Sequence, residues 1–103
     1  PMFSKKTIQG DQIILQFTHT DKGLKSANGR PLDYFEIAGS DGVFKRADVT
    51  IDGSELIVRN PFIKNPVNVR FAWDETAQPN FFNGDGLPAV PFRTNDPYRD
   101  VVL

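Results

Sequence analysis

The segment "VNVRFAWD", residues 67–74, alternates apolar and polar side chains along its length. Its larger apolar members would share one face: Val67, Val69, Phe71 and Trp73. Because successive side chains of a β-strand point to opposite faces, this period of two predicts a strand with one buried and one solvated side. The same pattern predicts further strands at 3–8, 12–18, 33–38, 43–51 and 55–59.

Turn-forming residues separate these segments at short intervals, as in Ser40-Asp41-Gly42 and Asp52-Gly53-Ser54. About six strands with one apolar face each must bury those faces against each other. A chain of 103 residues is the usual size of one domain. We therefore expect a single all-β domain, an antiparallel β-sandwich of immunoglobulin-like or jelly-roll-like type. The expected core consists of Phe17, Phe35, Ile37, Val49, Leu56, Val58, Val69 and Phe71.

The charge pattern excludes several classes of partner. The net charge is −1, and like charges form no block longer than a pair such as Lys5-Lys6. Nucleic-acid binding needs a basic stripe, so we expect no nucleic-acid partner. No polybasic patch and no apolar run of about 20 residues is present, so we expect no membrane partner. The chain has no cysteine, which excludes disulfides and cysteine-based zinc sites.

Candidate catalytic residues are few. A serine or cysteine hydrolase needs a base beside its nucleophile, and His19 is the only histidine. Gln16 stands where an Asp-x-x-His pair would need its aspartate. The stretch "AGSDG", 38–42, has Ala38 where a G-x-S-x-G nucleophile turn has glycine, and a strand pattern follows it instead of a helix. We expect His19 to be a partly exposed loop histidine and 38–42 to be a hairpin turn.

The stretch "FNGDGLPAVPFRTND", 82–96, fails as a calcium or nucleotide loop. With Gly86 at position 6 of a calcium loop, positions 1 and 12 would be Phe81 and Phe92, which cannot ligate a cation through their side chains. A dinucleotide fingerprint would need glycine at Ala89 and a helix where Pro88 stands. We therefore expect no metal site and no cofactor.

Several segments resemble one family. "FEIAGSDGVFKRADVTIDGSELIV", 35–58, and "NPVNVRFAWDETAQPNFFNGDGLPAVPFRTND", 65–96, are similar to the C-terminal β domain of sialate O-acetylesterases. "PMFSKKTIQGDQIILQFTHTDKGL", 1–24, resembles the entry into that domain. The pieces are weak singly, but they occur in the right order and end in a GLPA-x-PFRT motif at 86–94.

The resemblance implies that the chain is a part of an esterase that does not contain the catalytic residues. The family consists of carbohydrate esterases that remove O-acetyl groups from sialic acids or related sugars, with a Ser-His-Asp type site on an SGNH-type α/β domain. In that pattern the nucleophile and the Asp-x-x-His segment lie upstream, and residues 1–103 match neither. We therefore expect a non-catalytic accessory domain whose partner is the upstream catalytic domain. Its role would be to brace that domain, and it could also wall one side of a cleft for an O-acetylated sugar.

Two further expectations concern the parent protein. Pro1 precedes Met2, so we expect the chain to be cut from something longer. Relatives of this kind are often exported, which favours a periplasmic or extracellular setting.

The closing segment 80–94 has more apolar residues than a solvated tail needs. They could close one end of the sandwich, dock on the missing catalytic domain, or do both. We expect the ordered domain to cover 1–94 and a flexible tail to cover 95–103, since the tail has few anchoring residues. Arg93 is expected to bond carbonyl groups of the loop at 80–86.

An alternative interpretation is a free-standing carbohydrate-binding or adhesion-type sandwich. A sugar site combines an aromatic face with polar groups, and Trp73 lies near Asp74 and Asn80 in the sequence. Trp73 is also in phase with the predicted core, so it could equally be buried. The candidate sugar-facing or domain-facing residues are Trp73, Asn80, Asn83 and Arg93.

Overall fold

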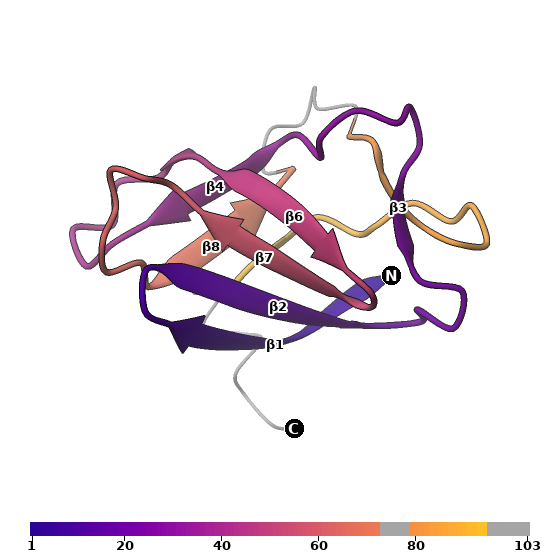
Figure 1. Cartoon of the computed structure of the whole chain (residues 1–103), viewed down its shortest axis with the longest axis horizontal. Coiled ribbons are helices and arrows are strands. Elements are labelled where there is room, and N and C mark those ends of the chain that lie inside the picture. The colour runs from indigo at the N-terminus through magenta and orange to yellow at the C-terminus, as the bar shows by residue number, and fades with distance from the viewer. Residues whose placement is uncertain (73–78, 95–103) are drawn as a thin grey trace.

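The computed structural model describes residues 1–72 and 79–94, which form strands and turns (Figure 1). No helix in these two ranges is long and apolar enough to cross a membrane. The strands are β1 (Met2–Gln9), β2 (Gln12–Thr18), β3 (Leu24–Ser26), β4 (Phe35–Ala38), β5 (Lys45–Arg46), β6 (Asp48–Asp52), β7 (Glu55–Arg59), β8 (Asn68–Phe71), β9 (Phe81–Asn83) and β10 (Phe92–Arg93). The prediction of an all-β antiparallel sandwich is confirmed.

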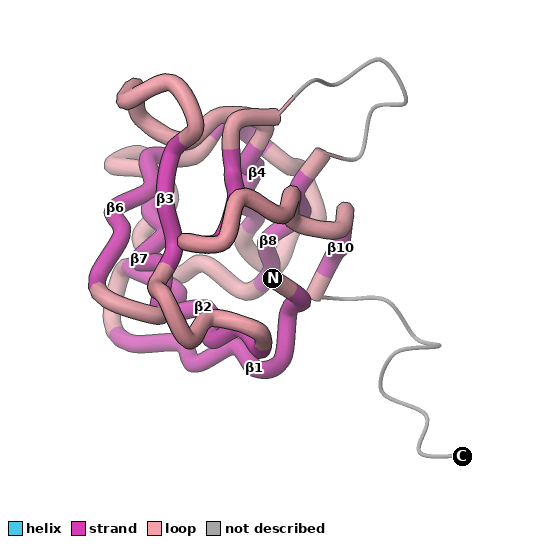
Figure 2. The backbone as a smooth tube through the Cα atoms, turned by 90° about the vertical axis from the view of Figure 1, so that its right-hand side faces the viewer, coloured by secondary structure: helices cyan, strands magenta, loops and turns pink. Residues whose placement is uncertain are grey.

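Two four-stranded sheets form the layers of the sandwich. One sheet has the strand order β1-β2-β7-β6, and the other has the order β10-β8-β4-β5. Figure 1 shows the first sheet lying over β4 and β8 of the second. All the pairings are antiparallel. A two-stranded ribbon of β3 and β9 adds to one end of the sandwich, near the N-terminus (Figures 1 and 2).

The core is built around a cluster of phenylalanine rings between the sheets. Phe35 and Phe71 face each other in neighbouring strands, with ring centroids 4.6 Å apart. Phe81 and Phe92 pack against Phe71 at 5.6 and 5.7 Å. Aliphatic side chains from both sheets fill the rest: Ile13, Leu15, Ile37, Leu56, Val58 and Val69 are fully buried. Two rings of the core thus come from the irregular closing segment.

The alternation predicted one strand over 43–51, but the structure has two strands there. The first, β5, pairs with β4 in one sheet, while β6 pairs with β7 in the other. The chain changes sheets at Ala47, which is buried and donates its N–H to the carbonyl of Phe35. Val49, predicted to be core, is only partly buried and packs against the core from β6. An unbroken alternation cannot reveal such a crossing because both halves keep the same period.

The connection 19–32 is also more ordered than its polar composition predicts. β3 forms within it and pairs with β9, so that Leu24 lies opposite Asn83 and Ser26 lies opposite Phe81. Phe81 and Phe92 of the closing segment are buried in the core between the sheets. The expected flexible tail, 95–103, lies outside the described residues.

Candidate functional site

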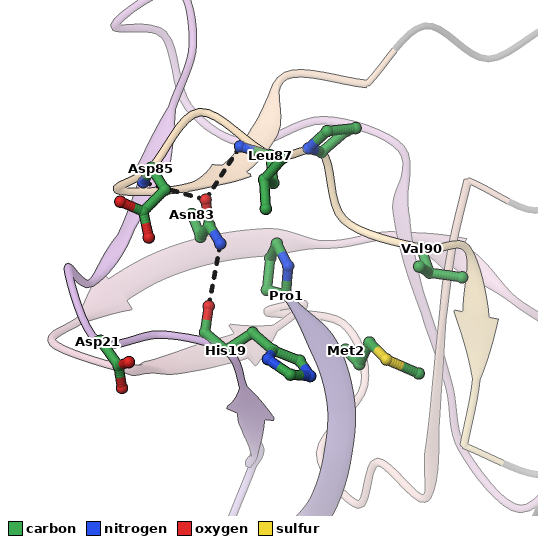
Figure 3. Close-up of a pocket in the computed structure, with 9 residues that line it drawn as sticks. Pro1, Met2, His19, Asp21, Asn83, Asp85, Leu87 and Val90 are labelled. Atoms are coloured by element: carbon green, nitrogen blue, oxygen red, sulfur yellow. Dashed lines mark hydrogen bonds between the residues drawn. The ribbon is translucent and has the colours of Figure 1, made fainter.

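A pocket of about 510 Å³ lies at the end of the sandwich where the first residues meet two loops. Figure 3 shows the side chains around it. The lining has a polar side and an apolar side: Pro1, Met2, His19, Asp21, Asn83, Asp85, Leu87, Pro88 and Val90. Residues from the start, the first quarter and the end of the chain are therefore brought together here.

Asn83 organises the polar side of this pocket, and its side chain is only 2% exposed. The amide oxygen Oδ1 accepts hydrogen bonds from the backbone N–H groups of Asp85 and Leu87, at 3.1 and 3.0 Å (Figure 3). Nδ2 donates to the carbonyl oxygen of His19 at 3.0 Å. The backbone N–H of Asn83 also donates to the carbonyl of Leu87, at 3.0 Å. These bonds close residues 83–87 into a defined loop and tie it to the loop after β2.

Gly84 lets these two loops approach each other closely. Its N–H donates to the carbonyl of Gly23 at 2.9 Å. A Cβ atom at this position would lie 2.0 Å from the carbonyl oxygen of Lys22, far inside any allowed contact. Lys22 also forms an ion pair with Asp85, at 3.2 Å between Nζ and Oδ1, but both side chains are solvated and the pair adds little stability.

The apolar side is formed by side chains that the domain itself leaves exposed. Met2, Leu87 and Val90 are 49%, 59% and 52% exposed. Val90 is fixed to the chain start because its N–H lies 3.4 Å from the carbonyl oxygen of Pro1.

Among the described residues that line this pocket, none offers a hydroxyl or thiol nucleophile to His19. His19 is exposed and adopts a left-handed backbone conformation, with φ of 60°. The pocket lining includes two aspartates but no serine or threonine. Within residues 1–72 and 79–94, no three histidine, aspartate or glutamate side chains gather into a group that could hold a metal ion. The pocket offers surface and shape, while acyl transfer needs a nucleophile beside a base.

Asn80 lies at the other end of β9, is 5% exposed, and holds the 26–33 loop. Its Nδ2 is 2.9 Å from Oδ1 of Asn28 and 3.1 Å from the carbonyl oxygen of Pro31. Its Oδ1 accepts the N–H of Asp33 at 3.1 Å, and its N–H lies 3.3 Å from Oδ1 of the same residue. Buried amides with this many partners typically position loops.

Among the described residues, Asn80 and Arg93 do not line the pocket. Arg93 lies in β10 opposite Arg70 and is partly buried. Its expected bonds to carbonyls at 80–86 stay a prediction. Trp73 lies outside the described residues. Of the four predicted residues, the pocket thus contains Asn83. The sequence indicated some of its other members separately, His19 as a candidate base and the apolar residues of 80–94, but it could not show that they meet in one pocket.

Comparison with solved structures gives a match that bears on function. No family model and no curated protein matches the chain. A crystal structure of a carbohydrate acetylesterase from Xanthomonas citri matches with a TM-score of 0.87 and 36% sequence identity. The match covers 92% of this chain but 22% of that esterase, so the chain spans about a fifth of its length. The chain is therefore similar, over nearly all of its residues, to one segment of a carbohydrate acetylesterase.

Proposed function

We propose that this chain is a non-catalytic β domain of a carbohydrate O-acetylesterase. The observation that carries the proposal is its similarity to a segment that makes up 22% of a carbohydrate acetylesterase. The sequence resemblance described above favours a sialate-type or related enzyme, with this domain C-terminal to an SGNH-type catalytic domain. The proposed role is to brace the catalytic domain and to wall one side of its substrate cleft.

The chemistry available in the chain supports an accessory role. Ester hydrolysis of the serine type requires a hydroxyl nucleophile within hydrogen-bond reach of a base. The chain has one histidine and no cysteine. The described lining of the pocket that contains His19 includes Asp21 and Asp85 but no hydroxyl side chain. The catalytic groups would therefore belong to another part of the esterase.

A hydrolysis assay tests this proposal directly. The purified 103-residue chain should not hydrolyse an aryl acetate or O-acetylated sialic acid, while the Xanthomonas citri esterase serves as the active control for acetyl release. Turnover by the isolated chain that a serine-directed reagent blocks would contradict the proposal. The sequence encoded upstream of Pro1 is a second test. We expect a Gly-Asp-Ser-type nucleophile block there, followed by an Asp-x-x-His segment.

A second candidate function is sugar binding, and an exposed ring near a second pocket favours it. Phe62 is 89% exposed beside a pocket of about 270 Å³. Asn60 fixes the turn beneath the ring, because its Oδ1 accepts the N–H of Phe62 and its Nδ2 donates to the carbonyl of Arg46, both at 2.8 Å. Polar side chains lie around the same pocket: Asp41, Lys45 and Asn65. A rigid aromatic face with a few polar groups suits a sugar ring.

Titration with sialic acid and neutral oligosaccharides distinguishes the two functions. If this domain binds sugar through the second pocket, amide resonances of 39–45 and 60–65 should shift in NMR spectra, and Phe62→Ala should abolish the shifts. The sequence-based alternative at Trp73 would instead move its indole resonance. If neither set of resonances moves at millimolar sugar, the domain has no sugar-binding function of its own.

A further inference from the structure

We propose that Met2, Leu87 and Val90, together with the pocket between them, form the surface that packs against the catalytic part of the esterase. This inference rests on the proposed function and specifies which face of the domain performs it. The expected counterpart is an apolar protrusion, with basic side chains around it, on the catalytic domain.

The closing segment divides its apolar residues between two roles. Phe81, Ala89 and Phe92 are buried in the core, whereas Leu87 and Val90 stay more than half exposed. Leu87 cannot rotate its backbone inward without cost. Its N–H is bound by Oδ1 of Asn83 and its carbonyl by the N–H of the same residue. The loop therefore holds this leucine at the surface.

The exposed side chains are not scattered. Single exposed apolar residues are normal on a soluble protein, but a group around one concavity marks a surface for another molecule. Met2 and Val90 line the same pocket as Leu87, and Pro1 and Pro88 extend its apolar side. Figure 3 shows Pro1, Met2, Leu87 and Val90 around one opening. Met2, Leu87 and Val90 each stay about half exposed, so the described part of the sandwich does not cover this patch.

The length of the esterase outside the matched segment indicates the occupant. The matched segment is 22% of that chain, so more than three quarters of the esterase lies outside it. Domains within one chain share interfaces of about 600–1,500 Å². A pocket of about 510 Å³ bordered by three exposed apolar side chains fits the centre of such an interface. A catalytic domain in the same polypeptide can cover this face permanently with an apolar surface of its own.

The charges at the pocket indicate the chemistry of the counterpart. Asp21 and Asp85 lie at its polar side. Of the ion pairs among the described residues, only the one between Lys22 and Asp85 lies at this pocket. The border of the pocket is therefore acidic overall. Because complementary charges align partner surfaces, the facing border on the catalytic domain should carry arginine or lysine.

A chimeric enzyme tests the surface. In the Xanthomonas citri esterase, the matched segment is replaced by this chain, and Leu87→Asp and Val90→Asp are introduced singly and together. Ile8→Asp is the matched control, because Ile8 is 48% exposed and lines neither pocket. The isolated chain carries the same substitutions as a second control for folding. Melting temperature and acetylesterase turnover are measured for each.

Leu87→Asp and Val90→Asp should each lower the melting temperature of the chimera by at least about 4 °C, while the isolated chain shifts by less than about 2 °C. Ile8→Asp should lower the melting temperature of the chimera by no more than it lowers that of the isolated chain. An active chimera that tolerates the double substitution overturns this surface and leaves the proposed function standing. A chimera that neither folds nor turns over with the unsubstituted chain overturns the proposed function as well. Dimerisation of the isolated chain in sedimentation experiments, abolished by Leu87→Asp, would assign the surface to a second copy and overturn the inference.

Discussion

The side-chain amide of Asn83 donates a hydrogen bond to the carbonyl oxygen of His19 at 3.0 Å, across 64 residues of chain. The same side chain accepts the N–H groups of Asp85 and Leu87. One buried residue thus determines the shape of its own loop and the position of a second loop. The apolar surface and the acidic border of the pocket both depend on it.

Asn83→Ala should lower the free energy of unfolding by about 2–4 kcal/mol. The substitution removes three hydrogen bonds, and each typically contributes about 0.5–1.5 kcal/mol net to stability. Urea denaturation measures the change. Asn65→Ala is the control, since Asn65 is exposed and should change stability by less than about 0.5 kcal/mol. Equal effects of the two substitutions would show that Asn83 does not hold the loops.

Gly84→Ala should destabilise the domain although it adds a single methyl group. Its Cβ would meet the backbone carbonyl of Lys22 at 2.0 Å, so the two loops must separate. Forced overpacking of this kind costs about 1–3 kcal/mol. Gly39→Ala is the matched control, because its Cβ would meet its nearest atom at 3.4 Å. A wild-type melting temperature for Gly84→Ala would mean that the approach of the two loops is not fixed.

The sequence predicted the strands of the sandwich better than its loops, for a physical reason. A buried strand face leaves a period of two in the sequence. The predicted inward-facing residues of two strands are indeed buried, Phe35 with Ile37 and Val69 with Phe71. The pairing of β3 with β9 leaves no such trace, because each strand has three residues and its partner is far away in the chain. The burial of the asparagines could not be predicted either, because asparagine is also a common residue of solvated turns.

The candidate site was predictable only in part. The apolar content of 80–94 indicated that the segment packs on something, but composition could not assign its members. Phe81 and Leu87 are both apolar, yet one is fully buried and the other is 59% exposed. The difference arises from the hydrogen bonds of Asn83, which bring loops from two ends of the chain together. Three-dimensional contacts of this kind cannot be read from a local pattern.

Phe71→Ala should cost about 3–5 kcal/mol of stability, the range for emptying a buried aromatic site. Phe71 is fully buried and packs against the rings of Phe35, Phe81 and Phe92. Phe62→Ala is the control for the same change in chemistry, because that ring is 89% exposed and its loss should cost less than about 0.5 kcal/mol. A loss below about 1 kcal/mol for Phe71→Ala in denaturant melts would contradict the burial of this ring.

The closing segment 80–94 should be ordered in the isolated chain, without a catalytic domain beside it. Its backbone is bonded along its length: the N–H of Ala89 donates to the carbonyl of Phe81 at 3.0 Å, and the N–H of Thr94 donates to the carbonyl of Val69 at 2.9 Å. The buried hydroxyl of Thr94 also accepts the N–H of Val69 and donates to Oδ1 of Asn68, at 3.0 and 2.8 Å.

NMR relaxation of the isolated chain checks this. Backbone order parameters for 80–94 should lie near about 0.85, as in rigid structure, and values below about 0.6 would mark the segment as flexible. The Asn83→Ala variant gives a sharper comparison, because it should loosen 84–87 while Phe81 and Phe92 remain anchored in the core. Flexibility throughout 80–94 in the wild-type chain would mean that the segment needs the catalytic domain to fold. Phe81 and Phe92 would then belong to the interface together with Leu87 and Val90. The core of the isolated domain would in that case end at β8.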